Sequence, residues 1–142
     1  EREGRFDVFL EPTEKPFELI NTVFYAPIKG LISDSFDLQN KHYGVDVLAS
    51  ENEAIKAVLG GTVVFSDWTT ETGYSIVIQH DNNLISLYKH NSVILKKIGE
   101  VVKAGDVISI IGNSGEYSSG PHLHFEMWQK GKAINPEHHI LF

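Results

Sequence analysis

The chain has 142 residues, of which 42% are hydrophobic and 22% charged, and its formal net charge at pH 7 is −7. This length suits one compact domain with a real core. Its 12 basic residues are scattered among 19 acidic ones, which argues against a nucleic-acid partner. Because the chain contains no cysteine, a metal site would need histidine and carboxylate ligands.

Residues 1–23 are expected to form an extension of uncertain structure in front of a domain that covers residues 24–142. Their apolar residues recur with no strong periodicity, and Pro12 and Pro16 interrupt any helix there. The first residues lack the hydrophobic stretch of a secretory signal. No window of the sequence approaches the ~20 consecutive apolar residues that a membrane helix needs.

From Phe24 onward, apolar residues alternate or stand in short runs bounded by Gly, Asn and Asp, a pattern typical of short strands. The sequence therefore predicts a mainly β fold, a single domain of antiparallel sheets with little helix. The clearest hairpin joins 75–78 to 84–87 through a turn at 80–83. The expected strands are 31–33, 45–48, 54–58, 62–66, 74–79, 84–90, 106–111 and 123–128.

Two stretches, residues 67–73 and 113–121, are rich in Ser, Thr and Gly. They are expected to be exposed loops, and loops of this kind often border functional sites. We therefore expect them to wall a substrate groove that holds a metal site.

The stretch that begins at Pro121 reads PHLHFE and carries the first chemical signal. On a strand, His122 and His124 project to one face while Leu123 and Phe125 face the other. Two rises of ~3.3 Å put the histidine Cα atoms ~6.6 Å apart. One ring can then bind a metal while the other reaches a bound water or substrate, or both can be ligands.

A second element is formed by His42, Gly44 and Asp46. The spacing of four puts the imidazole and the carboxylate on one face, and the intervening Gly and Val favour extended chain. Together with one histidine of the pair, this element supplies two imidazoles and one carboxylate, which leaves the fourth position of a zinc site open, as catalytic sites require. A third element is His90, which ends the second strand of the predicted hairpin.

Each element taken alone also has a structural interpretation. His90 can simply close a hairpin, and an HxH pair on a strand recurs by chance. Glu126 continues the face of the histidine pair, where it could orient a ligand, but a solvated carboxylate at the strand end is the favoured interpretation. His80, His138 and His139 are expected to be solvated.

In this order, the three elements resemble the signature of the lysostaphin and LytM-type zinc metallopeptidases, which are peptidoglycan endopeptidases. The resemblance extends from Phe24 to the C-terminus, so that residues 24–142 would form a LytM-type metallopeptidase domain. It implies that the cofactor is Zn²⁺ and that the catalytic pair is His90 and His122. The metal ligands implied in the same way are His42, Asp46 and His124.

The resemblance implies a zinc-dependent endopeptidase that hydrolyses peptide cross-links of bacterial peptidoglycan through a metal-activated water. Phe36 stands where some members that cut glycine bridges carry a tyrosine, and a phenyl ring cannot donate a hydrogen bond. The first expectation is therefore a direct stem-peptide cross-link of the D-alanyl-diaminopimelate type. Such a substrate implies work in the periplasm or cell envelope, with an export signal, a membrane anchor or a regulatory segment upstream of Glu1.

The main alternative is a non-catalytic module of the same fold that binds the cell wall or activates a partner hydrolase. The five filled positions favour an active enzyme over this alternative. A cupin barrel would need a glutamate several residues beyond the HxH pair, whereas Glu126 follows too soon. A His-Glu-x-x-His helix is absent, which excludes a thermolysin-like protease.

Overall fold

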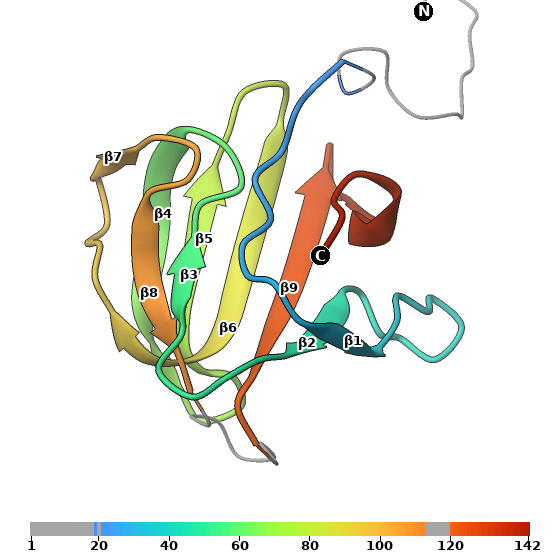
Figure 1. Cartoon of the computed structure of the whole chain (residues 1–142). Coiled ribbons are helices and arrows are strands. Elements are labelled where there is room, and N and C mark those ends of the chain that lie inside the picture. Colours follow the sequence, from blue (N-terminus) through green and yellow to red (C-terminus); the bar gives the residue numbers. More distant parts are fainter. Residues whose placement is uncertain (1–18, 20, 113–119) are drawn as a thin grey trace, which may run out of the picture.

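The computed structural model describes residues 19, 21–112 and 120–142, and nearly all of its regular structure is antiparallel β-sheet (Figure 1). The mainly β fold predicted from the alternating pattern is confirmed. The strands are β1 (Leu31–Asp34), β2 (Val45–Leu48), β3 (Ala54–Lys56), β4 (Gly61–Thr69), β5 (Gly73–Gln79), β6 (Leu84–Ile94), β7 (Val101–Val102), β8 (Val107–Ile111), β9 (His122–Gln129) and β10 (Lys132–Ile134). A short 3₁₀ helix, η2 (Pro136–His138), follows them.

The main path of the sheet runs β1-β2-β9-β6-β5-β4-β7, and β10 extends it beside β9. The long strand β6 links this path to β3 and β8. Its residues 84–91 pair with β9 and β5, whereas its residues 91–94 pair with β8. In Figure 1, β3 and β8 lie in front of β4 and β5, so β6 carries the chain from one layer to the other.

The core lies between these layers and is built from the inward face of each alternating strand. Leu123, Phe125 and Met127 of β9 are fully buried, and so are Ile76 and Ile78 of β5. Full burial of one such side chain stabilises the fold by about 1.5–3 kcal/mol. The outward residues of the same strands remain available for a site.

The structure confirms the predicted hairpin, in which Val77 of β5 stands opposite Leu87 of β6. It corrects the first predicted loop, because β4 continues to Thr69 and β5 already begins at Gly73. The cross-strand pair of Trp68 and Tyr74 belongs to this extended ladder, and aromatic pairs of this kind stabilise a sheet. Only residues 70–72 are left to form the turn.

Several sequence predictions lie wholly or partly outside the described residues. These are the extension, apart from Leu19 and residues 21–23, and most of the second loop, at 113–119. The boundary at residue 24 and the loop-walled groove therefore stay predictions. Leu19 packs into the core. Among the described residues, no helix has the length and apolar character needed to cross a membrane.

Candidate metal centre

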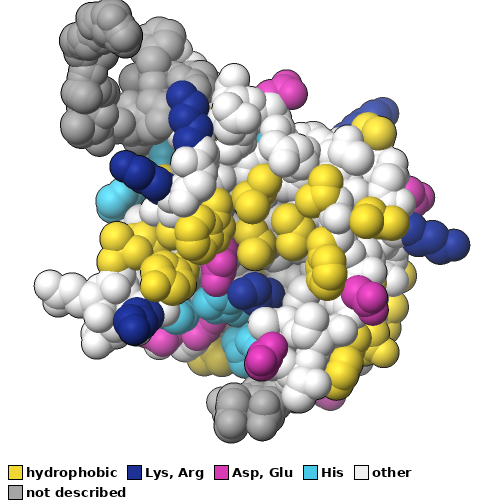
Figure 2. All heavy atoms as spheres, turned by 180° about the vertical axis from the view of Figure 1, so that it is seen from behind, with side chains coloured by type: hydrophobic (Ala, Val, Ile, Leu, Met, Phe, Trp, Pro, Cys, Tyr) yellow, Lys and Arg dark blue, Asp and Glu magenta, His cyan; other side chains and the backbone are white. Residues whose placement is uncertain are grey.

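Strand β9 presents His122, His124 and Glu126 on one face. Leu123 and Phe125, which alternate with them, are fully buried in the core. The predicted division of this strand into a histidine face and an apolar face is therefore confirmed. Figure 2, which views the molecule from behind, shows histidine side chains beside acidic ones, with hydrophobic side chains adjoining.

Strand β2 places Asp46 directly opposite His124 in the antiparallel register. Val45 and Val47 anchor β2 in the core, so the carboxylate between them points to the face of the histidines. Asp46 Oδ1 lies 2.7 Å from His124 Nδ1. Two motifs that are 78 positions apart in the chain thus meet through one strand pairing.

His42 reaches the same place from the turn that precedes β2. Its Nδ1 lies 2.7 Å from the carbonyl oxygen of Ser35, which can only accept, so Nδ1 carries the proton and Nε2 has a free lone pair. Nε2 is buried without a hydrogen-bond partner. It lies 3.4 Å from Asp46 Oδ2 and 3.7 Å from Asp34 Oδ2.

These three side chains suit a metal ion. One ligand atom from each of His42, Asp46 and His124 lies within 4.8 Å of the other two. The buried Nε2 of His42, which has no hydrogen-bond partner, faces this space and is a ready ligand atom. Two imidazoles and one carboxylate form a donor set that zinc accepts, with a fourth position left for water or substrate.

Charges within the cluster are mutually stabilised. Burial raises the pKa of Asp46, but the hydrogen bond and charge of His124 outweigh it, and the net pKa is lowered. Burial lowers the pKa of His124, but its hydrogen bonds to Asp46 and Glu126 raise the net pKa above the ordinary value. The metal-free protein therefore holds His124 as a cation between two carboxylates to a higher pH than usual.

The remaining predicted residues, His90 and His122, form a second pair beside this group. Their ring centroids are 4.8 Å apart, and the ring of His90 is 6.2 Å from that of His124. His122 Nδ1 lies 2.9 Å from the carbonyl oxygen of Gly120, which makes Nδ1 the protonated nitrogen and leaves the lone pair on Nε2. The structure thus brings all five predicted site residues together.

Glu126 is the clearest correction to the sequence analysis. It is only 6% exposed, not a solvated carboxylate at the strand end. Its Oε2 lies 2.7 Å from His124 Nε2, and Trp128 Nε1 donates to its Oε1 over 2.8 Å. Burial raises its pKa, but these hydrogen bonds and the charge of Lys89 lower the pKa to about 2. It is therefore a carboxylate throughout the neutral range.

Two charged residues near the site were missed by the sequence analysis. Lys89 stands opposite His124 in the register of β6 and β9, and its Nζ lies 3.4 Å from Glu126 Oε2. Asp34 ends β1 and faces His42. Lys89 adjoins His90 in the third motif, but its contact with Glu126 depends on which strands pair, a long-range choice.

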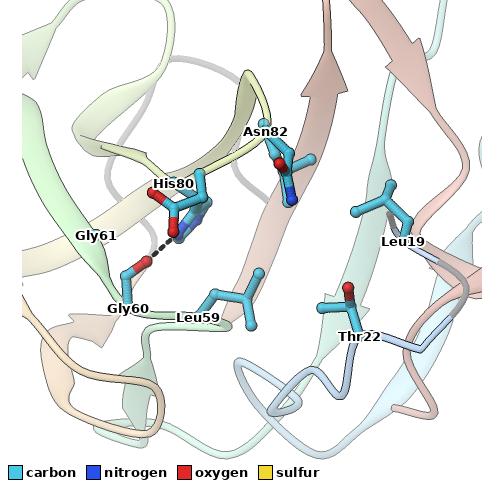
Figure 3. A pocket seen from close by; sticks show the side chains of 9 residues that line it. Leu19, Thr22, Leu59, Gly60, Gly61, His80 and Asn82 are labelled. Atoms are coloured by element: carbon cyan, nitrogen blue, oxygen red, sulfur yellow. Dashed lines mark hydrogen bonds between the residues drawn. The ribbon is translucent and has the colours of Figure 1, made fainter. Parts of the chain in front are cut away.

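His80 is a second correction, because it is buried and not solvated in its turn. Its Nδ1 lies 2.8 Å from the carbonyl oxygen of Gly60, and its Nε2 lies 2.7 Å from Ser86 Oγ. Figure 3 shows His80 bonded to Gly60 among the residues that line a pocket. The volume of this cavity is about 460 Å³. None of the five predicted site residues lines this cavity. Of the other two histidines, His138 is exposed and His139 is half-buried against Phe24.

Known proteins are similar to this chain in sequence and in fold. A metalloprotease of Buchnera aphidicola, named as uncharacterized, is 40% identical over 96 residues, 68% of this chain and 25% of its own length. The murein hydrolase activator EnvC of Escherichia coli is 36% identical over 94 residues, 66% of this chain and 22% of EnvC. The chain thus spans a quarter or less of these curated relatives.

The fold also matches a solved structure of the antimicrobial peptidase lysostaphin from Staphylococcus simulans. The TM-score is 0.65 at 31% sequence identity, over 76% of this chain and 46% of the lysostaphin chain. The model of peptidase family M23 matches residues 40–136, a segment that contains all five predicted site residues. Because this match covers more than half of the sequence, the chain belongs to peptidase family M23.

Proposed function

We propose that this chain is a zinc-dependent endopeptidase that hydrolyses peptide cross-links of bacterial peptidoglycan. The observation that carries the proposal is the convergence of the ligand atoms of His42, Asp46 and His124 beside a second histidine pair. When bound, zinc polarises the peptide carbonyl and makes a water molecule acidic enough to attack it near neutral pH. Membership of the peptidase family and the fold of lysostaphin support this assignment.

The second histidine pair suits proton transfer. His122 turns its Nδ1–H to the Gly120 carbonyl, so its Nε2 can accept a proton from the attacking water. The adjacent ring of His90 lies close enough to share in stabilising the developing oxyanion and in returning a proton to the leaving amine. Neither histidine is needed as a ligand, since the other three side chains already supply a complete set.

For the substrate, we propose a direct stem-peptide cross-link of the D-alanyl-diaminopimelate type. Phe36 is half-buried against the core and has no hydroxyl group to offer an oxyanion. Because this substrate lies outside the cytoplasm, we also propose that the active protein works in the periplasm or cell envelope. The rate of muropeptide release from directly cross-linked walls, compared with the rate from glycine-bridged walls, tests this choice. Faster muropeptide release from glycine-bridged walls would contradict it.

A second candidate function is activation of a partner hydrolase without catalysis. The name of the relative EnvC, a murein hydrolase activator, favours it. A module of this kind would bind the wall or its partner through the same face and would not need the pair of His90 and His122.

One experiment separates the two functions. The zinc content of the purified chain is measured together with release of soluble muropeptides from isolated walls, for wild type and His122→Ala. We expect about one zinc ion in both proteins and muropeptide release by wild type alone. Wild-type protein that binds zinc yet releases nothing from several wall types would favour the activator.

A further inference from the structure

Behind His124, on the side away from Asp46, lies a buried carboxylate. Glu126 Oε2 is 2.7 Å from His124 Nε2, and Trp128 Nε1 donates to Glu126 Oε1 over 2.8 Å. Lys89 Nζ adds a contact of 3.4 Å to Oε2 from the neighbouring strand. Glu126 is thus held at both oxygens while it touches His124.

The chemistry of these partners decides where the protons are. An indole N–H and a lysine ammonium can only donate, so the two oxygens of Glu126 act as acceptors. His124 must then donate through Nε2, which leaves Nδ1 as the nitrogen for a metal ion. This is the nitrogen that faces Asp46.

His42 is arranged in the opposite sense. Its Nδ1 donates to the Ser35 carbonyl, and its Nε2 faces the space shared with Asp46. The two imidazoles therefore offer different nitrogens to the same space, and each choice is set by an acceptor behind the ring. A metal-binding histidine commonly donates its other N–H to such an acceptor, which orients the ring and raises its basicity.

We propose that Glu126 is a positioning residue of the metal centre, whose carboxylate holds His124 in the orientation and tautomer that present Nδ1 to the metal ion. This inference rests on the metal-binding part of the proposed function and is independent of catalysis. A residue that served only the packing of β9 would be apolar, like its fully buried neighbour Met127. Burial of a carboxylate costs several kcal/mol unless partners compensate, and three surround Glu126.

The test compares Glu126→Gln with Glu100→Gln as the matched control. Both substitutions remove one negative charge, but the described hydrogen bonds of the Glu100 side chain comprise a single one, from the backbone N–H of Lys97. It precedes β7, at the far end of the sheet path from β1. Glutamine keeps the size of Glu126 but carries an NH2 donor in place of one oxygen, so it cannot accept at both of the positions that face His124 and Trp128.

Zinc affinity is measured by competition with a chromophoric chelator, and the free energy of unfolding is measured on the zinc-free proteins. We expect Glu126→Gln to bind zinc about 10–100-fold more weakly than wild type, and Glu100→Gln to match wild type. The absorption spectrum of bound Co²⁺, which reports coordination geometry, should change in Glu126→Gln only. Unchanged affinity and spectrum in folded Glu126→Gln would overturn the proposal.

Trp128→Phe supplies a second test that keeps every charge in place. It removes the donor to Glu126 Oε1 and lets the carboxylate rotate, so we expect a smaller loss of zinc affinity in the same direction. If Glu126→Gln does not fold, an unchanged zinc affinity in Trp128→Phe overturns the proposal.

Wild type that binds no zinc would overturn this proposal and the proposed function together. Wild type that binds zinc without cleaving walls would refute catalysis alone, and weaker binding by Glu126→Gln would still support the positioning role.

Discussion

His90 stands where β6 leaves its partners β5 and β9 and turns toward β8. Its φ is 68°, in the left-handed region that side chains other than glycine rarely adopt. The buried side chain of Asn91 fixes this corner, because its Nδ2 donates to the carbonyl oxygens of Tyr74 and Tyr88 over 2.8 and 3.0 Å. The strained backbone directs the His90 ring toward His122, an arrangement typical of functional sites.

Replacement of His90 separates its backbone strain from its chemistry. A Cβ atom in the left-handed conformation costs roughly 1–2 kcal/mol, which glycine avoids. We therefore expect His90→Gly to be about 1 kcal/mol more stable than His90→Ala, while neither variant releases muropeptides. Urea denaturation of the zinc-free variants measures the difference, and equal or reversed stabilities would contradict the strain.

At the level of elements, the site depends on the close approach of β2 and β9. Gly44 precedes β2, and a Cβ atom built there would lie 2.2 Å from the carbonyl oxygen of Phe125 and 2.7 Å from Glu126 Cγ. No side chain fits in that space without moving β9. The glycine between His42 and Asp46 is therefore a packing requirement that keeps both candidate ligands next to His124.

Gly44→Ala should disturb the stability and the metal site together. Overpacking at this contact is expected to cost about 1–3 kcal/mol and to weaken zinc binding, because β9 carries His124. Gly60→Ala is the control, since its Cβ atom would come no closer than 3.3 Å to another atom. Urea denaturation and chelator competition measure both effects, and a Gly44→Ala protein that behaves like Gly60→Ala would disprove the packing requirement.

At the scale of the whole molecule, metal binding should stabilise the fold. The candidate ligands come from β2, from β9 and from the turn before β2, so an ion bound to all three favours the folded chain. Free zinc at 100 times its Kd is expected to stabilise by about 2.7 kcal/mol, and removal by a chelator to reverse this. Thermal unfolding with and without chelator should show the shift in wild type and His138→Ala, and its loss in His124→Ala. A full zinc shift in His124→Ala would exclude this histidine as a ligand.

The global stability should also depend on the protonation of His80. Burial lowers the pKa of His80 below its ordinary value, and the hydrogen bond to Gly60 only partly offsets this. The unfolded chain therefore binds the proton more readily, and stability falls as the pH drops below about 6.5. This loss stops once the pH passes the lowered pKa of the folded state.

The variant His80→Gln removes this titration. The difference in free energy of unfolding between wild type and His80→Gln should shrink as the pH falls from 7 to 5, by at most about 1.4 kcal/mol per pH unit. Contributions from His124 and Glu126 are present in both proteins and cancel in the difference. Zinc-free buffers are needed, with His138→Gln as the exposed control. A difference that does not change with pH would show that His80 titrates alike in both states.

The sequence by itself determined the β class, the hairpin and the shared face of His122 and His124. These follow from local rules, because side chains alternate along any strand and a polar turn between two apolar runs closes a hairpin. The order of the three motifs also identified the family, which the match over residues 40–136 confirms. The sequence analysis missed β7, which has two residues, and β10, which has three. A segment this short has too few residues to show an alternation of apolar and polar side chains.

Only the tertiary structure decided the surroundings of Glu126 and His80. Both look like polar residues beside a turn or a strand end, yet both are buried. Lys89 reaches Glu126 because β6 pairs with β9 in one particular register, and His80 bonds to Gly60 because that residue lies next to its hairpin. Such contacts join residues that are 20 and 37 positions apart in the chain. The alternation of side chains along one strand does not predict them. They depend on which strands become neighbours, a choice made by the burial of the whole apolar core at once.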